Sequence, residues 1–521
     1  MLKRMRSFLV LVMLFITVTM SAQVTTATMS GKVTAQDEPI IGATIVAVHE
    51  PSGTRYGTVT NVSGQFNLQG MRTGGPYKVE ISYVGYQTAI YKGINLSLGE
   101  NYVLNVSLKE SSELLDEIVV TASKNSNMKS DRAGAITNIG EEQMAMIPTV
   151  GRSMNDIMRL TPQGANTGNG FAVGGGNYRQ SSVTVDGAAF SNSFGIGSNL
   201  PGGGSPISLD ALEQIAVSVT PFDKILSAII VRLAINAVTK SGTNDFYATA
   251  YTYLNNENLN GDKVGDLELI REKSQKYLYG ASFGGAIIKN KLFFFVNGEY
   301  EDNVTAGPKS RARLSDSDDW GSNTANVNRP TVGKMDEIRN YFIDKYDYDP
   351  GRYQGYSIKT PAYKIMARLD WNINDNNKLN FRFTRAHSKD NSGPTSSVSP
   401  FYATDIYDGG AAASKGSGNV NHNAAMYFEN SRYFKEYNFT SYASEWNSKW
   451  LDGSLNNVTR VTYSFQDEPR SYEGAADFPT IDILEDGAVY ARIGPDVFSP
   501  GNLAQARTFV LTDELSYTAG I

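Results

Sequence analysis

The chain has 521 residues, of which 29 are Tyr, 49 are Gly, three are His and none is Cys. The absence of Cys excludes disulfides, thiolate metal sites and Cys nucleophiles, and three widely spaced His residues leave little for a His-based metal centre or triad. The formal net charge is −6, and Lys and Arg form no basic stripe of the kind that binds nucleic acid. We therefore predict no catalytic residue, no metal site, no cofactor and no nucleic-acid partner.

The N-terminus has the pattern of a secretory signal peptide. Lys3, Arg4 and Arg6 precede an apolar run over residues 8–18, and small residues follow as far as Ala22. A transmembrane anchor is the alternative, but it needs about 20 apolar residues. We predict cleavage near Ala22 and export of the mature chain from the cytoplasm.

Residues 27–110 are typical of a small β-sandwich. Short alternating segments recur at about 8–12-residue spacing between turns rich in Gly and Pro. The predicted strands are 31–34, 43–49, 55–60, 65–68, 77–83 and 102–108. Gly31-Lys32-Val33, the run 39–45, the turn 58–64 and Tyr83-Val84-Gly85-Tyr86 occur in the order of the carboxypeptidase regulatory-like domain, which this segment resembles. The resemblance implies a spacer or docking module without peptidase activity.

A β-branched segment follows at the end of this domain. Its residues are Asp116, Glu117, Ile118, Val119, Val120, Thr121 and Ala122. The pattern alone fits an ordinary edge strand, and it also fits a backbone that pairs with a strand of a partner. The segment resembles the TonB box of TonB-dependent outer-membrane receptors, which implies that the TonB energy-coupling protein of the inner membrane pulls on it.

The next region combines short helices with glycine-rich loops. A helix from Ser153 to about residue 160 ends at Thr161-Pro162, and Ser153 can cap it. A glycine loop, a strand that ends in Asp186-Gly187 and the run 212–215 follow in the order of the plug of TonB-dependent receptors. In that family the apical plug loops face the ligand. The resemblance therefore implies ligand contacts at Asn177, Tyr178, Arg179, Gln180, Asn192 and Phe194.

Other interpretations of this region remain open. Gly174-Gly175-Gly176 could cradle phosphate, although the strand, Lys and helix of a nucleotide site do not surround it. Asp186 and Gly187 fit a tight turn, in which Asp bonds to the backbone and Gly supplies a positive φ. An enzyme would need a convergent acid and base. Asp186 and Glu213 are available, but a turn and a solvated element end account for them as well.

One stretch departs from the family pattern. Residues 224–233 are apolar and contain no Gly, where related sequences have a glycine-rich turn, and the pattern resumes at Ile235. Two compensating frameshifts or simple divergence would each explain the departure. In either case the run is expected to disturb local packing or solubility.

Residues from 245 onward alternate over long segments, which predicts a transmembrane β-barrel. Two hairpins are expected, 277–286 with 292–300 and 363–371 with 378–385, and further strands at 434–446, 458–465 and 507–517. Residues 302–356 and 389–431 are predicted as long external loops. A soluble sandwich or propeller would also alternate, but its strands are usually about 5–6 residues long.

The predicted fold class is mainly β, with an N-terminal β-sandwich, an α/β plug domain and a partial transmembrane antiparallel β-barrel. We predict a signal peptide over residues 1–22, the sandwich over 27–110, a TonB-box-like linker over 111–124, the plug over 130–240 and the barrel over 241–521. About 8 to 10 strands fit into the last segment. The barrel of that family has more strands than this. We therefore expect a receptor truncated within the barrel, whose unclosed sheet would expose unpaired edges to lipid.

The resemblance covers essentially the whole chain. It implies a Gram-negative outer-membrane receptor that takes up a bulky nutrient, contacts outer-membrane lipids and TonB, and can carry a surface lipoprotein. The alternative is a surface structural or adhesion protein without transport, which would need no coupling segment. The identity of the ligand is not encoded in any motif of the sequence.

Overall fold

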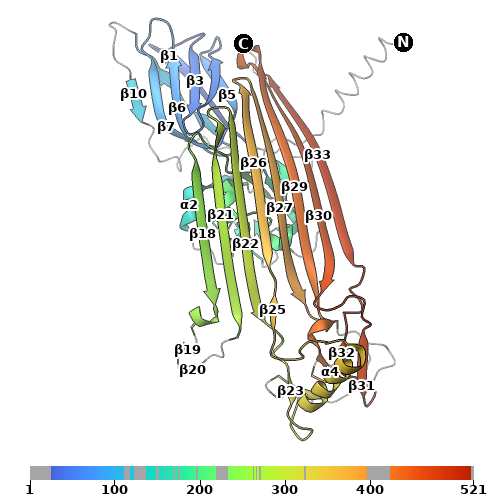
Figure 1. Cartoon of the computed structure of the whole chain (residues 1–521). Coiled ribbons are helices and arrows are strands. Elements are labelled where there is room, and N and C mark those ends of the chain that lie inside the picture. Colours follow the sequence, from blue (N-terminus) through green and yellow to red (C-terminus); the bar gives the residue numbers. More distant parts are fainter. Residues whose placement is uncertain are drawn as a thin grey trace, which may run out of the picture.

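The computed structural model describes residues 25–110, 118–121, 136–147, 152–158, 160–162, 164–167, 170–173, 176–194, 198–218, 233–261, 263–265, 267–268, 272–321, 324, 326–395 and 423–517. The predicted signal peptide and residues 224–232 of the apolar departure lie outside these residues. The described chain is dominated by strands, which confirms the predicted mainly-β class. Figure 1 shows a sandwich at one end, a long curved sheet, and a smaller domain against the inner face of that sheet.

The sandwich consists of two sheets that enclose an apolar core between residues 27 and 108. Its strands are β1 (Ala27–Ala35), β2 (Glu38–Pro39), β3 (Thr44–His49), β4 (Thr54–Val59), β5 (Gln65–Met71), β6 (Gly74–Ser82), β7 (Ala89–Leu96), β8 (Asn101–Val103) and β9 (Val106–Ser107). Two strands, the two-residue β2 and the longer β7, were not predicted; the position of β7 matters most. Strand β7 lies next to the edge of the second sheet, where β10 (Ile118–Thr121) pairs with it in parallel.

The inner domain, residues 136–239, is built on a five-stranded sheet in the order β11-β16-β17-β14-β15. Its strands and helices are β11 (Ile136–Gly140), α2 (Glu141–Met146), α3 (Met154–Met158), β12 (Gly164–Asn166), β13 (Phe171–Val173), η2 (Tyr178–Gln180), β14 (Ser181–Val185), β15 (Ala188–Ala189), η3 (Gly202–Gly204), η4 (Leu209–Ala211), β16 (Leu212–Ser218) and β17 (Leu233–Thr239). Helix α3 is shorter than predicted. Ser153 precedes it and exchanges hydrogen bonds with Asp156.

The long sheet runs β18-β21-β22-β26-β27-β29-β30-β33, with β25 added beside β22. Its strands are β18 (Tyr247–Asn256), β21 (Ser274–Ile288), β22 (Leu292–Ala306), β25 (Ser357–Lys359), β26 (Ala362–Asn374), β27 (Asn377–Ser392), β29 (Tyr433–Trp450), β30 (Leu455–Tyr472) and β33 (Leu503–Tyr517). All neighbours are antiparallel, and both predicted hairpins are present. Within the described chain, β18 and β33 each pair with a single strand.

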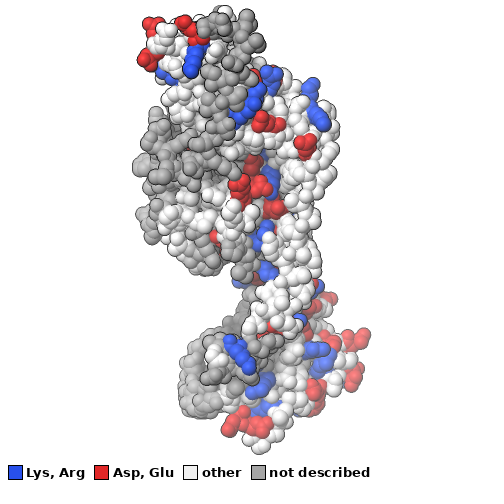
Figure 2. Space-filling model, turned by 90° about the vertical axis from the view of Figure 1, so that its left-hand side faces the viewer, with Lys and Arg blue, Asp and Glu red and all other residues white. Residues whose placement is uncertain are grey.

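Side chains alternate between the two faces of this sheet. The outer face carries large apolar side chains, among them Phe283, Val296, Leu369, Phe381, Tyr442, Val461 and Phe509. The inner face carries buried polar and charged side chains, among them Glu299, Lys364, Asp370, Arg382, Glu445 and Arg460. This alternation, apolar outside and polar inside, is that of a membrane-spanning β-sheet. Figure 2 shows a column of uncharged surface beside a line of charged side chains, with further charged side chains at the two ends.

The two ends of the sheet differ. Short turns, residues 289–291, 375–376 and 451–454, join the strands at the end where the sandwich sits. The longer connections at the other end form a loop body, built from β23 (Arg311–Arg313), β24 (Val327–Thr331), α4 (Val332–Tyr346), β28 (Met426–Tyr427), η6 (Glu429–Ser431), β31 (Ile481–Glu485) and β32 (Ala488–Ile493) around its own small core.

The predicted loop bounds were wrong in two places. Strand β22 continues to Ala306 and β27 continues to Ser392, so both strands extend beyond the predicted loop starts at 302 and 389. The first connection also contains the helix α4 and is not simply a polar loop. The few remaining described segments are η5 (Glu257–Leu259), β19 (Lys263–Val264), β20 (Leu267–Glu268) and η7 (Leu451–Gly453). None of the described helices combines the length and apolar character needed to cross a bilayer.

Candidate functional site

A tight hairpin turn of the inner domain contacts the inner face of the long sheet, and we call this sheet the wall. Asp186 and Gly187 join β14 to β15, and both have positive φ, 44° and 75°. Two-residue turns of this kind favour Asp or Asn followed by Gly. A side chain at Gly187 would also meet Arg460 of β30, so glycine is required by both the backbone and the space.

The Asp186 carboxylate lies among arginines of the barrel wall. It accepts hydrogen bonds from the Thr239 backbone N–H (2.9 Å) and hydroxyl (2.6 Å). Arg382 Nη1 donates to it at 3.0 Å and also donates to the Val185 carbonyl, while Arg368 Nη1 lies 3.7 Å away. Thus the carboxylate bonds mainly across to β17 and the wall, not to its own turn as the sequence suggested.

The neighbouring carboxylate Asp370 completes a group that we call the charge cluster: Asp186, Arg368, Asp370 and Arg382. Arg368 Nη2 donates to Asp370 Oδ1 at 2.8 Å, and its Nη1 donates to the Thr239 carbonyl at 2.7 Å. Burial opposes the charge on Asp186, but Arg382, Arg368 and the Thr239 hydrogen bonds outweigh it and lower the pKa of the carboxyl. The cluster therefore ties an ionised carboxylate of the inner domain to the wall.

The sandwich also reaches this place. Arg72 Nη2 lies 4.0 Å from Asp370 Oδ2, and Gly74 of β6 lies against the Glu213 carboxylate of β16. Burial raises the pKa of Glu213 to about 7, and Arg72 and Arg368 oppose that rise. One site is thus built from the sandwich, the inner domain and the long sheet.

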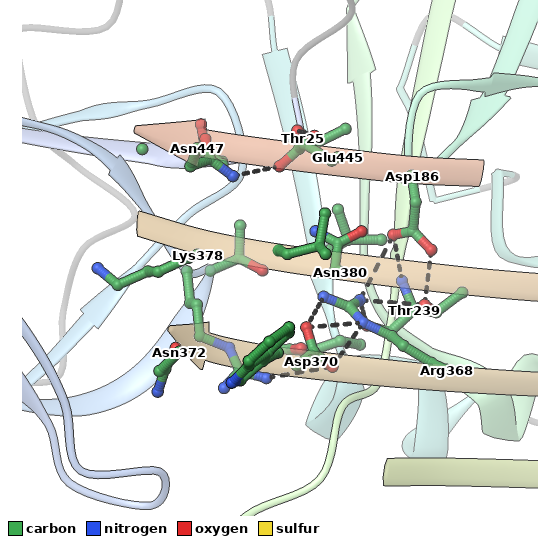
Figure 3. A pocket seen from close by; sticks show the side chains of 18 of the residues that line it. Thr25, Asp186, Thr239, Arg368, Asp370, Asn372, Lys378, Asn380, Glu445 and Asn447 are labelled. Atoms are coloured by element: carbon green, nitrogen blue, oxygen red, sulfur yellow. Dashed lines mark hydrogen bonds and ion pairs between the residues drawn. The ribbon is translucent and has the colours of Figure 1, made fainter. Parts of the chain in front are cut away.

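These residues surround a small polar cavity of about 70 Å³. Figure 3 shows the dashed contacts that join Asp186, Thr239, Arg368 and Asp370 on one side of it, with Lys378 of β27 close to the sandwich. On the far side, Glu445 accepts hydrogen bonds from Arg460 (2.6 Å) and Thr25 (2.6 Å). The lining is polar and the space holds a few waters at most.

A second buried ion pair lies between two strands of the wall and binds the inner domain through one of its carboxylate oxygens. Lys364 of β26 pairs with Glu299 of β22 at 2.5 Å. Glu299 also accepts hydrogen bonds from Ser208 of the inner domain (2.8 Å) and Tyr251 of β18 (2.9 Å). Apolar contact accompanies these polar ones, because the Phe190 ring lies edge-on to Phe439 of β29 at 4.7 Å.

The predicted ligand-contact residues fall in two loops of the inner domain. Asn177 caps η2 through a hydrogen bond from the Arg179 N–H, and the Arg179 guanidinium lies over the Tyr178 ring. The Asn192 side chain accepts from the Phe194 N–H at 2.9 Å and from Gln466 of β30 at 3.3 Å. The Gln180 side chain lies outside the described residues. The second loop is therefore bound to the wall.

The predicted TonB-box-like segment is described only from Ile118 to Thr121. These residues form β10, whose register places Ile118 beside Ala89 and Thr121 beside Lys92 of β7. Asp116, Glu117 and Ala122 lie outside the described residues. The described part of the segment therefore forms an edge strand of the sandwich and lies apart from the charge cluster.

The wall residues of the site were not among those predicted from the sequence. Arg368, Asp370 and Arg382 stand inside alternating strands, where their inward direction follows from the apolar neighbours Leu369, Phe381 and Phe383. That signal was present in the sequence, but the partner Asp186 lies almost 200 positions away. Among the described residues no group of three or more His, Asp or Glu side chains could hold a metal ion. The arrangement holds the inner domain against the long sheet through ion pairs.

The fold and the site define a class: an outer-membrane β-sheet protein with a domain held against its inner wall. The model of the outer membrane beta barrel domain family matches residues 238–521, and the chain belongs to that family. The carboxypeptidase regulatory-like domain model matches residues 28–109. These matches confirm the resemblance stated from the sequence and the outer-membrane location.

Individual proteins give weaker likenesses. The chain is 23% identical over 353 residues to the TonB-dependent transporter Oar of Myxococcus xanthus, which covers 62% of this chain and 30% of the relative. Two solved structures are similar: the outer membrane transporter YddB of Escherichia coli (9% identity, TM-score 0.48, 74% of this chain and 45% of that one), and the siderophore receptor PirA of Acinetobacter baumannii (14%, 0.40, 72% and 44%). The chain thus spans less than half of each of these proteins. These three proteins are named as two transporters and a receptor.

Proposed function

We propose that this protein is a TonB-dependent outer-membrane receptor for the energy-coupled uptake of a bulky nutrient. The observation that carries the proposal is the charge cluster. Through it Asp186 of the inner domain is bound to two arginines of a wall whose outer face is apolar. Buried charges that help to hold a domain can be separated by force, because each charge becomes hydrated once it leaves its partner. The similarity to Oar supports the same proposal.

In this proposal the inner domain is the plug, over residues 130–240, and residues 241–521 supply barrel strands. The loop body marks the outer surface, because long loops face outward in such proteins and short turns face the periplasm. The two apical loops then contact the ligand. One loop contributes Asn177, Tyr178, Arg179 and Gln180, and the other contributes Asn192 and Phe194. A surface lipoprotein can cover the same side.

Energy enters through the segment from Asp116 to Ala122, within the linker 111–124. Its β-branched side chains favour an extended backbone, which suits pairing with a strand of the TonB energy-coupling protein. Residues 1–22 act as the signal peptide, and the sandwich over 27–110 lies in the periplasm. Outer-membrane lipids contact the apolar outer face of the strands.

The test is a deletion of residues 116–122 in the native organism. We expect the depletion of at least one nutrient from the medium to depend on the gene, and to be lost in the deletion strain although the protein reaches the outer membrane in normal amount. A matched control replaces Asn125, Ser126 and Asn127 with Ala in the polar stretch that follows. Uptake that continues unchanged without residues 116–122 would contradict the proposal and favour a surface structural or adhesion protein.

A further inference from the structure

The sandwich sits on the turn end of the long sheet through a set of polar contacts. Asn372 Nδ2 of β26 donates to Thr54 Oγ1 at 3.0 Å. Lys378 Nζ of β27 donates to the Arg55 carbonyl at 3.2 Å and lies 3.4 Å from the centre of the Tyr56 ring. The strand β4 of the sandwich therefore rests directly on the last residues of β26 and the first residues of β27.

Further contacts surround this one. Arg460 Nη2 of β30 donates to Thr25 Oγ1 at 2.7 Å, and Ser516 of β33 donates to Gln69 at 2.6 Å. The inner domain takes part through Gln214, which accepts from the Leu98 N–H at 2.6 Å. The sandwich thus spans the turn end from β26 to β33 and touches the inner domain as well, as the position of the blue domain in Figure 1 shows.

This seam is polar and open to solvent, unlike the inner-domain contact. An open cavity of about 230 Å³ lies along it, lined mainly by polar side chains of the sandwich and the barrel turns. A second open cavity of about 670 Å³ belongs mainly to the sandwich and reaches the barrel at Gly453 and Ser454. The sandwich core contains no described residue of the wall, whereas the inner-domain core includes Phe295, Met366, Ala386, Phe439 and Ala443 from it. An apolar contact is added by Leu98 of the sandwich, which packs with Ala216 and Val238 of the inner domain. A polar interface open to water loses little when it separates.

The seam also borders the charge cluster. Arg72 reaches it from the sandwich beside Asp370, and Gly74 covers Glu213. When the sandwich leaves, water reaches the side of the cluster that faces the turn end. The strand β10 pairs with β7 of the same sandwich, so a pull on that strand acts on the sandwich.

We propose that the sandwich is a reversible cap that closes the turn end of the barrel in the resting state, and that it must undock before the inner domain can move. The contacts that hold the cap are those of Thr54, Tyr56 and Arg72 with the wall and of Leu98 with the inner domain. The role of undocking in uptake rests on the proposed function. The undocking itself does not depend on that function.

The first test measures undocking without any ligand. The chain has no Cys, so single cysteines report cleanly. Thr54→Cys at the seam is compared with Ala188→Cys in the inner-domain core, both in the folded 521-residue chain in mild urea, with a maleimide carrying a bulky polyethylene glycol as probe. We expect labelling at position 54 to be faster by about tenfold or more, since local openings span a wide range of free energies. Equal rates at the two positions would overturn the proposal.

The second test locks the cap. The pair Thr54→Cys with Asn372→Cys is oxidised in cells and compared with each single variant and with Val46→Cys paired with Glu80→Cys, which bridges β3 to β6 inside the sandwich. We expect uptake to be lost on oxidation of the first pair only and to return with a reductant. Uptake that persists with the cap locked would overturn the proposal that the cap must undock before the inner domain moves. If deletion of residues 116–122 leaves uptake unchanged while position 54 is still labelled selectively, the proposed function fails and the cap stands.

Discussion

The barrel wall makes two contacts of different character. The inner domain shares an apolar core with it and adds buried ion pairs, whereas the sandwich meets it mainly through polar contacts beside an open cavity. Both domains lie at the same wall and share Arg368 and Asp370 as neighbours. The difference predicts an order of release: the polar contact that is open to solvent separates first, and the apolar contact with its buried charges separates second.

The largest effect is expected at the charge cluster. Asp186→Ala leaves Arg382, which is 1% exposed, without its carboxylate, and should cost about 3–5 kcal/mol of the inner domain's free energy of unfolding. Urea unfolding in detergent, followed by protection of Ala188→Cys, measures it. Lys334→Ala with Glu337→Ala, a solvent-exposed pair on α4, should change it by less than about 0.5 kcal/mol. A loss below about 1 kcal/mol for Asp186→Ala would remove the distinction between the two contacts.

The apolar half of the same contact comes next. Phe190 is fully buried against Phe439, so Phe190→Ala should cost about 3 kcal/mol through lost burial and the cavity left behind. The same unfolding assay applies. A double-mutant cycle with Phe439→Ala should give a coupling of about 0.5–1.5 kcal/mol, and strict additivity would speak against direct ring packing.

Glu213 should make cap docking depend on pH. Its pKa is about 7 when the cap is docked, and exposure returns it toward the ordinary value of 4.5, so docking takes up a proton. Docking is then fully favoured below about pH 4.5 and weakens as pH rises through 7, by at most tenfold per pH unit. The charged groups that face Glu213 are Arg72 of the sandwich, Arg368 of the wall, and Glu141 and Asp186 of the inner domain.

The measurement of this dependence is the labelling rate of Thr54→Cys between pH 5.5 and 8, corrected with an unstructured cysteine peptide. Glu213→Gln removes the titrating group and should flatten the profile. A profile that keeps its slope in Glu213→Gln would assign the dependence to another group.

The smallest effect is expected from one contact of the seam. Asn372→Ala removes a neutral hydrogen bond at an interface open to water, and should weaken docking by about 0.5–1.5 kcal/mol, a few-fold rise in labelling at position 54. The free energy of unfolding of the inner domain should not change. A matching loss in the inner domain would show that the two contacts separate together.

The sequence predicted the strands of the wall well, because apolar and polar residues alternate strictly over long segments. Strand β7 escaped prediction, since Lys92, Gly93 and Asn95 interrupt its alternation, and the position of β10 depends on that strand. The Asp186-Gly187 turn is a local feature and could be recognised from two residues. The charge cluster could not, because Arg368 and Arg382 meet Asp186 only after the wall has curved around the inner domain. Contacts between domains leave no periodic signal in a chain.

Single-molecule pulling tests the order of release most directly. Force is applied to a cysteine at Thr121, in the strand carried by the sandwich, while the chain is held through a second cysteine at Glu473 in the loop end, with the protein in a bilayer mimic. The account predicts a first, low-force event whose length matches release of the cap, then a separate event at higher force as the inner domain leaves the wall. A single event, or extension of the inner domain while Thr54 stays protected, would contradict it.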